Sequence, residues 1–217
     1  MQFTAWQPIY YSILQDFGFS EERDEEAAEL LAGILRGREP MLPAARSILS
    51  GCRAIVCGNA PKLSRELDEL QDRNAIFLAA DGATAVLLEH NIIPDIVVTD
   101  LDGPFPAILK ANRMGSIVAV HAHGDNLDAL KRYVPELKRV IGTVQCRPPP
   151  GLHSFGGFTD GDRTVFLARE LGAASIELLG FDYEDESVTP RKKRKLEWAK
   201  RLIELALEDV PPQSLQS

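Results

Sequence analysis

The sequence feature that most constrains the fold is an alternation, starting near Arg53, of short apolar runs with segments of helical periodicity. Each apolar run has the length of a strand that is buried on both faces of a sheet. Strands separated by helices pair in parallel, so we predict an α/β, Rossmann-like fold with a mostly parallel sheet of about six strands and flanking helices. The predicted strands are residues 54–57, 75–79, 96–99, 117–120, 139–141 and 175–179.

Helical segments lie between these runs and also precede them. Residues 6–17 are rich in aromatic side chains, Ser20 can cap a second helix with an acidic first turn, and Gly37 and Pro40 end it. The helices predicted after residue 50 are 61–71, 83–90, 104–112, 127–133, 163–171 and about 190–208. We therefore predict an N-terminal helical extension at 1–50, an α/β domain at 51–210 and a frayed tail at 211–217.

The composition argues against several classes of protein. A formal net charge of -8 disfavours binding to duplex nucleic acid, which depends on many Lys and Arg contacts with phosphate. The chain has no apolar stretch of about 18 residues and no secretion signal, so we expect no membrane contact and a cytoplasmic location. The spacing of Cys52, Cys57 and Cys146 suits neither a disulfide framework nor a zinc site, and we expect these cysteines to be reduced and buried.

Small and acidic residues follow most of the predicted strands. In an open parallel sheet the carboxyl ends of the strands meet at one edge, where ligands bind beside the N-termini of helices. The carboxylates in these turns are therefore expected to converge. The turns are Gly58-Asn59-Ala60-Pro61, Ala80-Asp81-Gly82-Ala83, Asp100-Leu101-Asp102-Gly103, His121-Ala122-His123-Gly124-Asp125-Asn126 and Gly180-Phe181-Asp182.

Convergent carboxylates need cations or protons between them. Two carboxylates about 4 Å apart repel by roughly 4 kcal/mol at an effective dielectric constant of about 20. Mg²⁺ suits such a site, because it is typically held by one or two carboxylates together with water and substrate phosphate oxygens. Asp100 and Asp102, two residues apart just after a strand, are the best candidates. At any single position Asp is also common in turns and at helix caps, so the prediction depends on the whole set.

A glycine-rich loop precedes the helix predicted at 163–171. The loop is Gly156-Gly157-Phe158-Thr159-Asp160-Gly161-Asp162-Arg163. It has two interpretations: a loop that closes on phosphates, with Asp160 near the metal and Arg163 on phosphate oxygens, or a capped helix start with Thr159 or Asp160 as the cap. The turn at Gly58 and Asn59 is likewise either a phosphate-binding turn or a simple one, and the chain has no standard P-loop.

Histidines and a basic run are further candidates for contact with a ligand. His121 and His123 share one face of a strand, and without a further His or Cys cluster they do not indicate zinc. His123 is either a substrate contact or a structural hydrogen-bonding residue. The basic run at 191–195 is either a solvated helix face or a source of cations, Lys192 and Lys195 among them, for the tail of a nucleotide triphosphate.

These motifs together resemble the archaeal-type 6-hydroxymethyl-7,8-dihydropterin pyrophosphokinases. The resemblance spans roughly residues 50–205 and keeps the motifs in order: 80–83, 94–103, 121–126 and 157–163. The motifs are more distantly similar to the thiamine pyrophosphokinases, in which a Lys stands in place of Arg163. Because this chain lacks the C-terminal β-patterned stretch of those enzymes, thiamine is not the expected acceptor.

The resemblance implies Mg²⁺-dependent transfer of the β,γ-diphosphate of ATP to the primary alcohol of a pterin, with AMP as the leaving group. It implies metal binding by Asp81, Asp100, Asp102 and Asp160. It places ATP near Gly58, Asn59, Asp81, Gly82, Thr159, Asp160, Arg163, Lys192 and Lys195, and the pterin near His123, Asp125, Asn126 and Phe158. Asp100, Asp102 and Arg163 would then serve catalysis through positioning and charge neutralisation, with Asp125 or a metal-oriented carboxylate as the proton acceptor.

The residues leave other functions open. One is a different nucleotide-dependent transferase, similar to the thiamine pyrophosphokinases or to glycosyltransferases. Another is a non-catalytic nucleotide-binding module, for which ATP with Mg²⁺ would raise the melting temperature without any acceptor being modified. The number of subunits is also left open, with a homodimer as one arrangement.

Overall fold

A six-stranded sheet forms the centre of the computed structural model, which describes residues 2–184 and 188–208. Its strands pair in parallel throughout, in the spatial order β5-β4-β3-β2-β1-β6. The predicted α/β class with a mostly parallel sheet is confirmed. The strands are β1 (Arg53–Cys57), β2 (Ile76–Ala80), β3 (Ile96–Thr99), β4 (Ile117–Ala122), β5 (Val140–Val144) and β6 (Ser175–Leu179).

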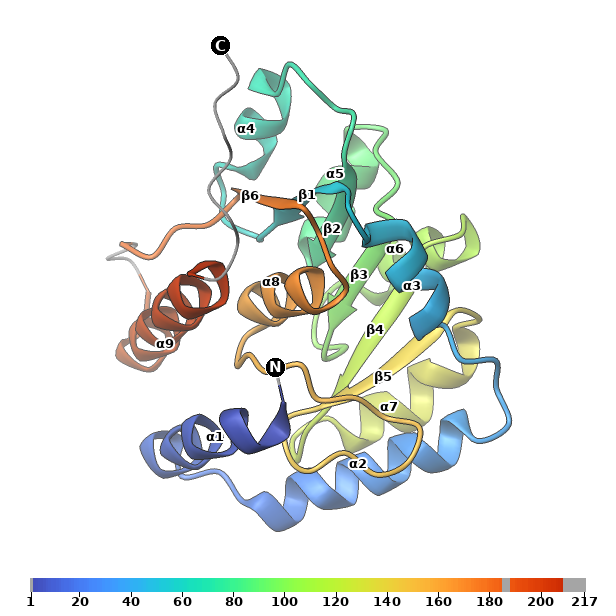
Figure 1. Ribbon diagram of the computed structural model, residues 1–217, viewed down its shortest axis with the longest axis vertical. Coiled ribbons are helices and arrows are strands. Elements are labelled where there is room, and N and C mark those ends of the chain that lie inside the picture. The colour runs from blue at the N-terminus through green and yellow to red at the C-terminus, as the bar shows by residue number, and fades with distance from the viewer. Residues whose placement is uncertain (1, 185–187, 209–217) are drawn as a thin grey trace.

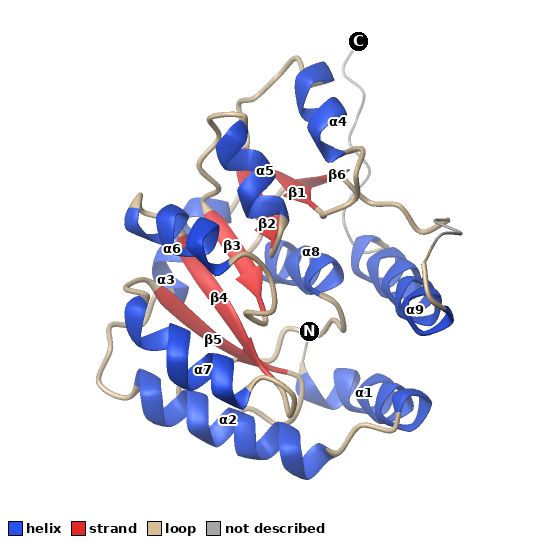
Figure 2. Cartoon of the chain, turned by 180° about the vertical axis from the view of Figure 1, so that it is seen from behind, coloured by secondary structure: helices blue, strands red, loops and turns tan. Residues whose placement is uncertain are grey.

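Helices cover both faces of the sheet (Figures 1 and 2). One face carries α4 (Leu63–Glu69), α5 (Ala83–Glu89), α6 (Phe105–Arg113) and α7 (Leu127–Tyr133), with a short 3₁₀ turn at Val134–Glu136. The opposite face carries α3 (Leu42–Leu49) and α8 (Asp160–Glu170), and α9 (Pro190–Leu207) packs against α8. None of the helices in 2–184 and 188–208 is long and apolar enough to cross a membrane.

The N-terminal helices belong to the same hydrophobic core as the sheet. Helix α1 (Phe3–Phe17) buries Trp6, Tyr10 and Ile13, and α2 (Glu21–Leu35) lies along β5 and against α7. The predicted boundary at residue 50 stays a prediction, and the predicted tail at 211–217 lies outside the described residues.

Helix α8 is the crossover that brings the chain from one side of the sheet to the other. The strand order grows outward from β1 to β5, after which α8 packs across β3, β2 and β1, and β6 pairs with the other side of β1. The order therefore reverses next to β1. In open α/β sheets, ligands bind at the carboxyl ends of the strands beside such a reversal. Because α8 follows β5, its N-terminus starts at that same edge.

Several predicted boundaries differ from the structure, and the shifts at the end of β5 and at the start of α8 have a physical cause. Strand β5 continues to Val144 instead of ending at 141, because it pairs with the full length of β4 as far as Ala122. Helix α8 begins at Asp160 instead of 163, because Thr159 and Asp162 form a capping box at its start. The cysteines are free, but Cys52 is partly exposed rather than buried, since it lies in the turn before β1.

Candidate active site

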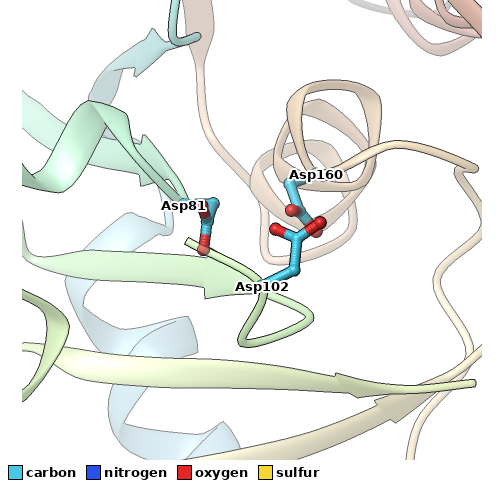
Figure 3. Close-up of side chains that lie close together, drawn as sticks. All are labelled: Asp81, Asp102 and Asp160. Atoms are coloured by element: carbon cyan, nitrogen blue, oxygen red, sulfur yellow. The ribbon is translucent and has the colours of Figure 1, made fainter. Parts of the chain in front are cut away.

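Three aspartates from separate segments converge at the carboxyl edge of the sheet. Asp81 follows β2, Asp102 follows β3, and Asp160 begins α8. One carboxylate oxygen from each lies within 4.8 Å of the others, and Figure 3 shows the three side chains directed into one space. The predicted convergence of the strand-end aspartates is therefore seen for these three.

The backbone around this cluster is shaped to bring the carboxylates together. Asp81 and Leu101 both have positive φ, at 42° and 69°. The Thr99 hydroxyl donates to Asp81 Oδ1 over 2.5 Å and accepts from the backbone N–H of Leu101 over 2.8 Å, which fixes the two turns relative to each other. Gly103 lies against the carboxylate of Asp81, and a Cβ at this position would overlap it. A glycine is therefore required where the β3 turn passes Asp81.

The cluster holds more negative charge than its environment favours. Burial raises the pKa of Asp81, burial and the neighbouring Asp100 raise the pKa of Asp102 to about 6, and burial with the charge of Asp100 raises the pKa of Asp160 well above its usual range. Three hard oxygen ligands with mutually raised pKa values are the donor set that Mg²⁺ prefers. The residues present therefore fit the predicted metal.

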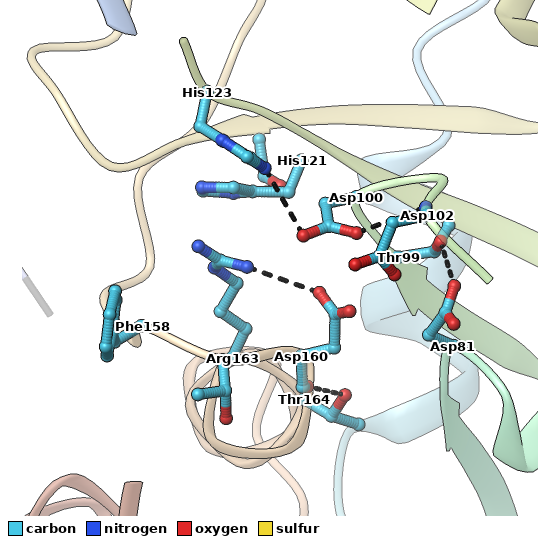
Figure 4. A network of polar contacts seen from close by, with 12 residues as sticks. Asp81, Thr99, Asp100, Asp102, His121, His123, Phe158, Asp160, Arg163 and Thr164 are labelled. Carbon is cyan, nitrogen blue, oxygen red and sulfur yellow. Dashed lines mark hydrogen bonds and ion pairs between the residues drawn. The ribbon is translucent and has the colours of Figure 1, made fainter. Parts of the chain in front are cut away.

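Asp100 lies beside this group of three rather than within it. Its Oδ2 accepts from His123 Nε2 over 3.3 Å, and its Oδ1 accepts from the backbone N–H of Asp102 over 3.3 Å. Although burial opposes its charge, the hydrogen bond from His123 and the guanidinium of Arg163 hold the pKa of Asp100 below its usual range. Asp100 is thus an ionised carboxylate that joins the acidic cluster to the residues after β4 (Figure 4).

Arg163 is a buried cation next to the carboxylates. Its side chain is 8% exposed, Nη1 donates to Asp160 Oδ1 over 3.2 Å, and Nη2 donates to Gln145 Oε1 over 3.4 Å. Gly157 allows this placement: it has a φ of 97°, and a Cβ there would lie 2.7 Å from the Cα of Arg163. Thr159 caps α8, as one interpretation of the glycine-rich loop predicted, and Asp160 and Arg163 lie at the cluster, while contact of this loop with phosphates stays a prediction.

A cavity of about 380 Å³ opens over the carboxyl ends of β1, β2 and β6, and we call it the β1 cavity. Its floor is bare backbone, because Gly58 packs against the Gly180 carbonyl and a Cβ at Gly58 would lie 2.6 Å from that oxygen. Lys195 is half-buried in its wall, and burial together with Arg163 lowers the pKa of Lys195. The residues predicted to bind ATP that line it are Gly58, Asn59, Asp81, Gly82, Thr159, Asp160, Arg163, Lys192 and Lys195.

A second cavity, of about 370 Å³, lies between the N-terminal helices, the turn after β4 and α9, and we call it the α2 cavity. His123, Asp125 and Phe158, all predicted to contact substrate, line it. Asn126 does not. Its side chain lies behind the wall, where it donates to the carbonyl oxygens of Asp100 and His121 over 2.7 Å each. Asn126 therefore supports the turn that carries His123.

The two cavities meet at one wall. Asp100, Phe158, Arg163 and Lys195 line both of them. Asp102 and Asp160 line only the β1 cavity, while His123 and Asp125 line only the α2 cavity. The two cavities therefore adjoin at residues that carry one carboxylate and two cations.

The two predicted histidines have different surroundings. His121 is 2% exposed, its Nδ1 lies 3.1 Å from the Thr143 hydroxyl, and burial, with the nearby Arg163 charge, lowers its pKa well below the usual range. His121 is therefore a neutral structural residue. In His123, Nδ1 accepts from the backbone N–H of Asp125 over 3.3 Å, which leaves Nε2 as the protonated nitrogen that donates to Asp100.

A family model described as 6-hydroxymethylpterin diphosphokinase MptE-like matches residues 29–187. The chain belongs to this family. The match contains the acidic cluster and the glycine-rich loop, but it leaves out α1, the start of α2 and α9.

Similar archaeal proteins extend the match to nearly the whole chain. Each of the three named next is called 6-hydroxymethyl-7,8-dihydropterin pyrophosphokinase. The one from Methanothermobacter thermautotrophicus is 45% identical over 94% of both chains, and that from Pyrococcus furiosus is 41% identical over 94% of both. The one from Methanocaldococcus jannaschii is 39% identical over 94% of this chain and 95% of its own. The resemblance inferred from the motifs is confirmed.

Sequence reasoning missed two polar residues of the α2 cavity, Asp24 and Gln145. Asp24 is 3% exposed; its oxygens accept from the Tyr10 hydroxyl, the backbone N–H of Gly124 and Gln145 Nε2, over 2.8 Å each. A signal was present, because Asp24 stands on the helical face that buries Ala27, Ala28 and Leu31. A carboxylate on an apolar face is expected to have buried partners. Gln145 was missed because β5 was predicted to end too early.

Proposed function

We propose that this protein transfers the β,γ-diphosphate of ATP to the hydroxymethyl group of 6-hydroxymethyl-7,8-dihydropterin and releases AMP. The observation that carries the proposal is the shared wall between the two cavities. A donor in the β1 cavity and an acceptor in the α2 cavity would place the transferred group beside Asp100, Arg163 and Lys195. The names of the similar proteins support this choice of acceptor.

ATP fits the β1 cavity for three reasons. The cavity lies at the reversal of strand order, its floor is backbone without side chains at Gly58 and Gly180, and the N-terminus of α8 faces it. We propose that Asp81, Asp102 and Asp160 hold Mg²⁺, with Asp100 beside them. When bound, the metal would neutralise the phosphate oxygens and hold the triphosphate in line for attack.

The remaining steps belong to side chains of this protein. The alcohol oxygen of the pterin attacks the β-phosphorus, the bond between that phosphorus and the α–β bridging oxygen breaks, and AMP leaves. Arg163, held by Asp160 and Gln145, stabilises charge on the transferred group, and Lys195 does so from the side of α9. Arg163 is held in place by these two contacts and Lys195 is half-buried, and both features strengthen the stabilisation of the negative charge.

The proton of the alcohol passes to a carboxylate at the acceptor side. In a loose transition state the proton leaves late, so a weak base is sufficient. We assign it to Asp100, which lines both cavities, and keep Asp125, one of the predicted acceptors, as the alternative. The Asp125 side chain is 59% exposed and lies 3.6 Å from Arg23, away from the shared wall.

Mass spectrometry of the products tests the proposal. The protein is incubated with ATP, Mg²⁺ and 6-hydroxymethyl-7,8-dihydropterin. In one parallel incubation thiamine replaces the pterin, and in another a nucleotide sugar replaces the ATP. We expect AMP and a diphosphorylated pterin in equal amounts, and neither product without the pterin. AMP release with thiamine alone would point to another acceptor, and binding of ATP without any product would indicate a nucleotide-binding module. We place the reaction in the cytoplasm, where ATP is available.

A further inference from the structure

Residues outside the family match supply much of the α2 cavity. The C-terminal end of α1 and the turn into α2 contribute Phe17, Phe19 and Arg23, and α9 contributes Arg191 and Lys195. The proposed function requires a pocket for a flat heterocycle next to the shared wall, and these residues form the side of the α2 cavity opposite to the turn after β4.

Three aromatic rings gather on this side. Phe17 and Phe19 are stacked with centroids 5.7 Å apart and planes 11° apart, and Phe158 from the glycine-rich loop lies 4.9 Å from Phe17 and 6.3 Å from Phe19. Phe17 and Phe19 are only partly buried although both are large and apolar. Aromatic faces that line an open cavity are suited to stack with a planar ring.

Cations hold this aromatic group against α9. The Arg191 guanidinium lies 5.6 Å from the ring of Phe19, and Lys195 Nζ lies 5.7 Å from the ring of Phe158. Trp198 of the same helix donates to Asp16 Oδ2 over 2.9 Å, so α9 is tied to the end of α1. The N-terminal and C-terminal helices thus form one side of the cavity together, and its positive charge faces the shared wall.

The polar part of the cavity is the buried pair of Asp24 and Gln145. Three donors already occupy the Asp24 carboxylate, from Tyr10, Gly124 and Gln145, while two carboxylate oxygens can accept about four hydrogen bonds. One acceptor position therefore remains on a charged group that faces the cavity. A pterin presents adjacent amino and ring N–H donors along one edge of its flat ring, and these donors match such an acceptor.

We propose, on the basis of the function proposed above, that residues 17–24 are the element that recognises the acceptor: the pterin ring stacks on Phe19 and its neighbours, and its amino edge is directed to Asp24. The N-terminal helices then determine which acceptor is used, while the sheet edge determines the donor. Phe19 is a specificity residue in this arrangement and takes no part in the transfer itself.

Variants of Phe19 test this assignment. Phe19→Ala removes the ring, Phe19→Leu removes it but keeps an apolar side chain of similar size, and Phe19→Tyr keeps the ring. Tyr11→Ala is the matched control, because Tyr11 is an exposed aromatic residue of the preceding helix α1 that does not line the cavity. Calorimetry measures pterin binding in the presence of the α,β-methylene analogue of ATP, in which the bond that breaks cannot be cleaved, and a second titration measures the affinity for the analogue alone.

We expect the Ala and Leu variants to bind the pterin about tenfold more weakly. Their affinity for the ATP analogue and their melting temperature should be unchanged. The Tyr variant and the Tyr11→Ala control should bind both ligands as the original protein does. Pterin binding that is unaffected by both ring-removing variants overturns the assignment. A parallel loss of affinity for the ATP analogue also overturns it, because Phe19 would then act through the whole site. If the original protein turns over the pterin and the variants do so equally well, only this inference fails; if the original protein does not, the proposed function fails.

Discussion

The β1 cavity and the α2 cavity are similar in size but differ in how the chain builds them. The β1 cavity is made mainly of turns that directly follow strands, with glycines as its floor and aspartates at its edge. The α2 cavity adds side chains from both ends of the chain, placed by helices that pack on the sheet, to the turns after β3 and β4. Under the proposed function, charge is handled at the edge of the parallel sheet, and the acceptor is selected by helices packed around that edge.

The largest effect on the β1 cavity is expected from removing a carboxylate from the acidic cluster. We expect Asp102→Asn to lower kcat by about 1000-fold with any acceptor, because a ligand of the metal is lost. Because the pKa of Asp102 is raised to about 6, its charge opposes folding above that pH in the absence of metal. Asp102→Asn is therefore expected to raise the melting temperature at pH 7.5 without Mg²⁺.

Rates of AMP release and melting curves with and without Mg²⁺ check this expectation. Glu69→Gln serves as a control, since Glu69 is an exposed carboxylate of α4 far from the cluster in the fold. An Asp102→Asn protein that retains full activity would remove the metal site from the proposal. An Asp102→Asn protein that loses both its activity and its melting transition would show that Asp102 is needed for folding.

The shared wall is tested by Arg163→Lys. Lysine keeps the charge but has one nitrogen in place of the two guanidinium nitrogens that bond Asp160 and Gln145 separately, so the cation loses its fixed position. We expect kcat to fall by about 100-fold, with both the donor and the acceptor still bound. Binding titrations with the α,β-methylene analogue of ATP and with the pterin separate the two effects. A variant that binds neither ligand would assign Arg163 to binding rather than to transfer.

The pH dependence of metal binding tests whether the protonation of Asp102 competes with Mg²⁺ at the β1 cavity. Protonation of Asp102, whose pKa is about 6, competes with the metal, so Mg²⁺ binding should weaken as the pH falls below 6. We expect the apparent Kd for Mg²⁺ to rise by about tenfold for each pH unit below that value. Magnesium titrations followed by calorimetry at pH 5, 6 and 7 measure it. A Kd that is constant over this range would contradict the raised pKa.

Much of the fold was predictable, because strands buried on both faces leave continuous apolar runs that helical segments cannot imitate. All six strands and the helices between them were located from this pattern, and the errors were at boundaries. Strand β5 was predicted too short because Gly142 interrupts the apolar run and glycine is depleted in strands, whereas pairing with β4 keeps it in the sheet. Only the tertiary structure supplies that pairing.

The candidate site was predictable on the donor side and much less so on the acceptor side. The aspartates could be recognised because the carboxyl ends of parallel strands meet at one edge, so a local motif determines a position in space. Asp24, Gln145, Phe17 and Phe19 follow no such rule, since their meeting depends on how α1 and α2 pack on the sheet. A sequence alone does not give that packing.

The smallest expected effect is that of removing one hydrogen bond from Asp24 in the α2 cavity. Tyr10→Phe deletes one buried hydroxyl, which donates to Asp24 Oδ2 over 2.8 Å, and keeps the ring in place. Loss of this hydrogen bond is expected to lower the free energy of unfolding by about 1 kcal/mol. Because Asp24 then has one fixed partner fewer, we expect the KM for the pterin to rise by about threefold, well under 1 kcal/mol of binding free energy, while the KM for ATP stays the same.

Tyr11→Phe is the matched control for this variant, because Tyr11 is the adjacent tyrosine of α1 and its hydroxyl contacts the exposed Glu21. Denaturant unfolding gives the stability, and initial rates at varied pterin and varied ATP give the two KM values. An equal change in both KM values would show that the N-terminal helices support the entire site. A change confined to the pterin would separate the two cavities in function as they are separated in structure, since the described residues that line both, Asp100, Phe158, Arg163 and Lys195, lie at the wall between them.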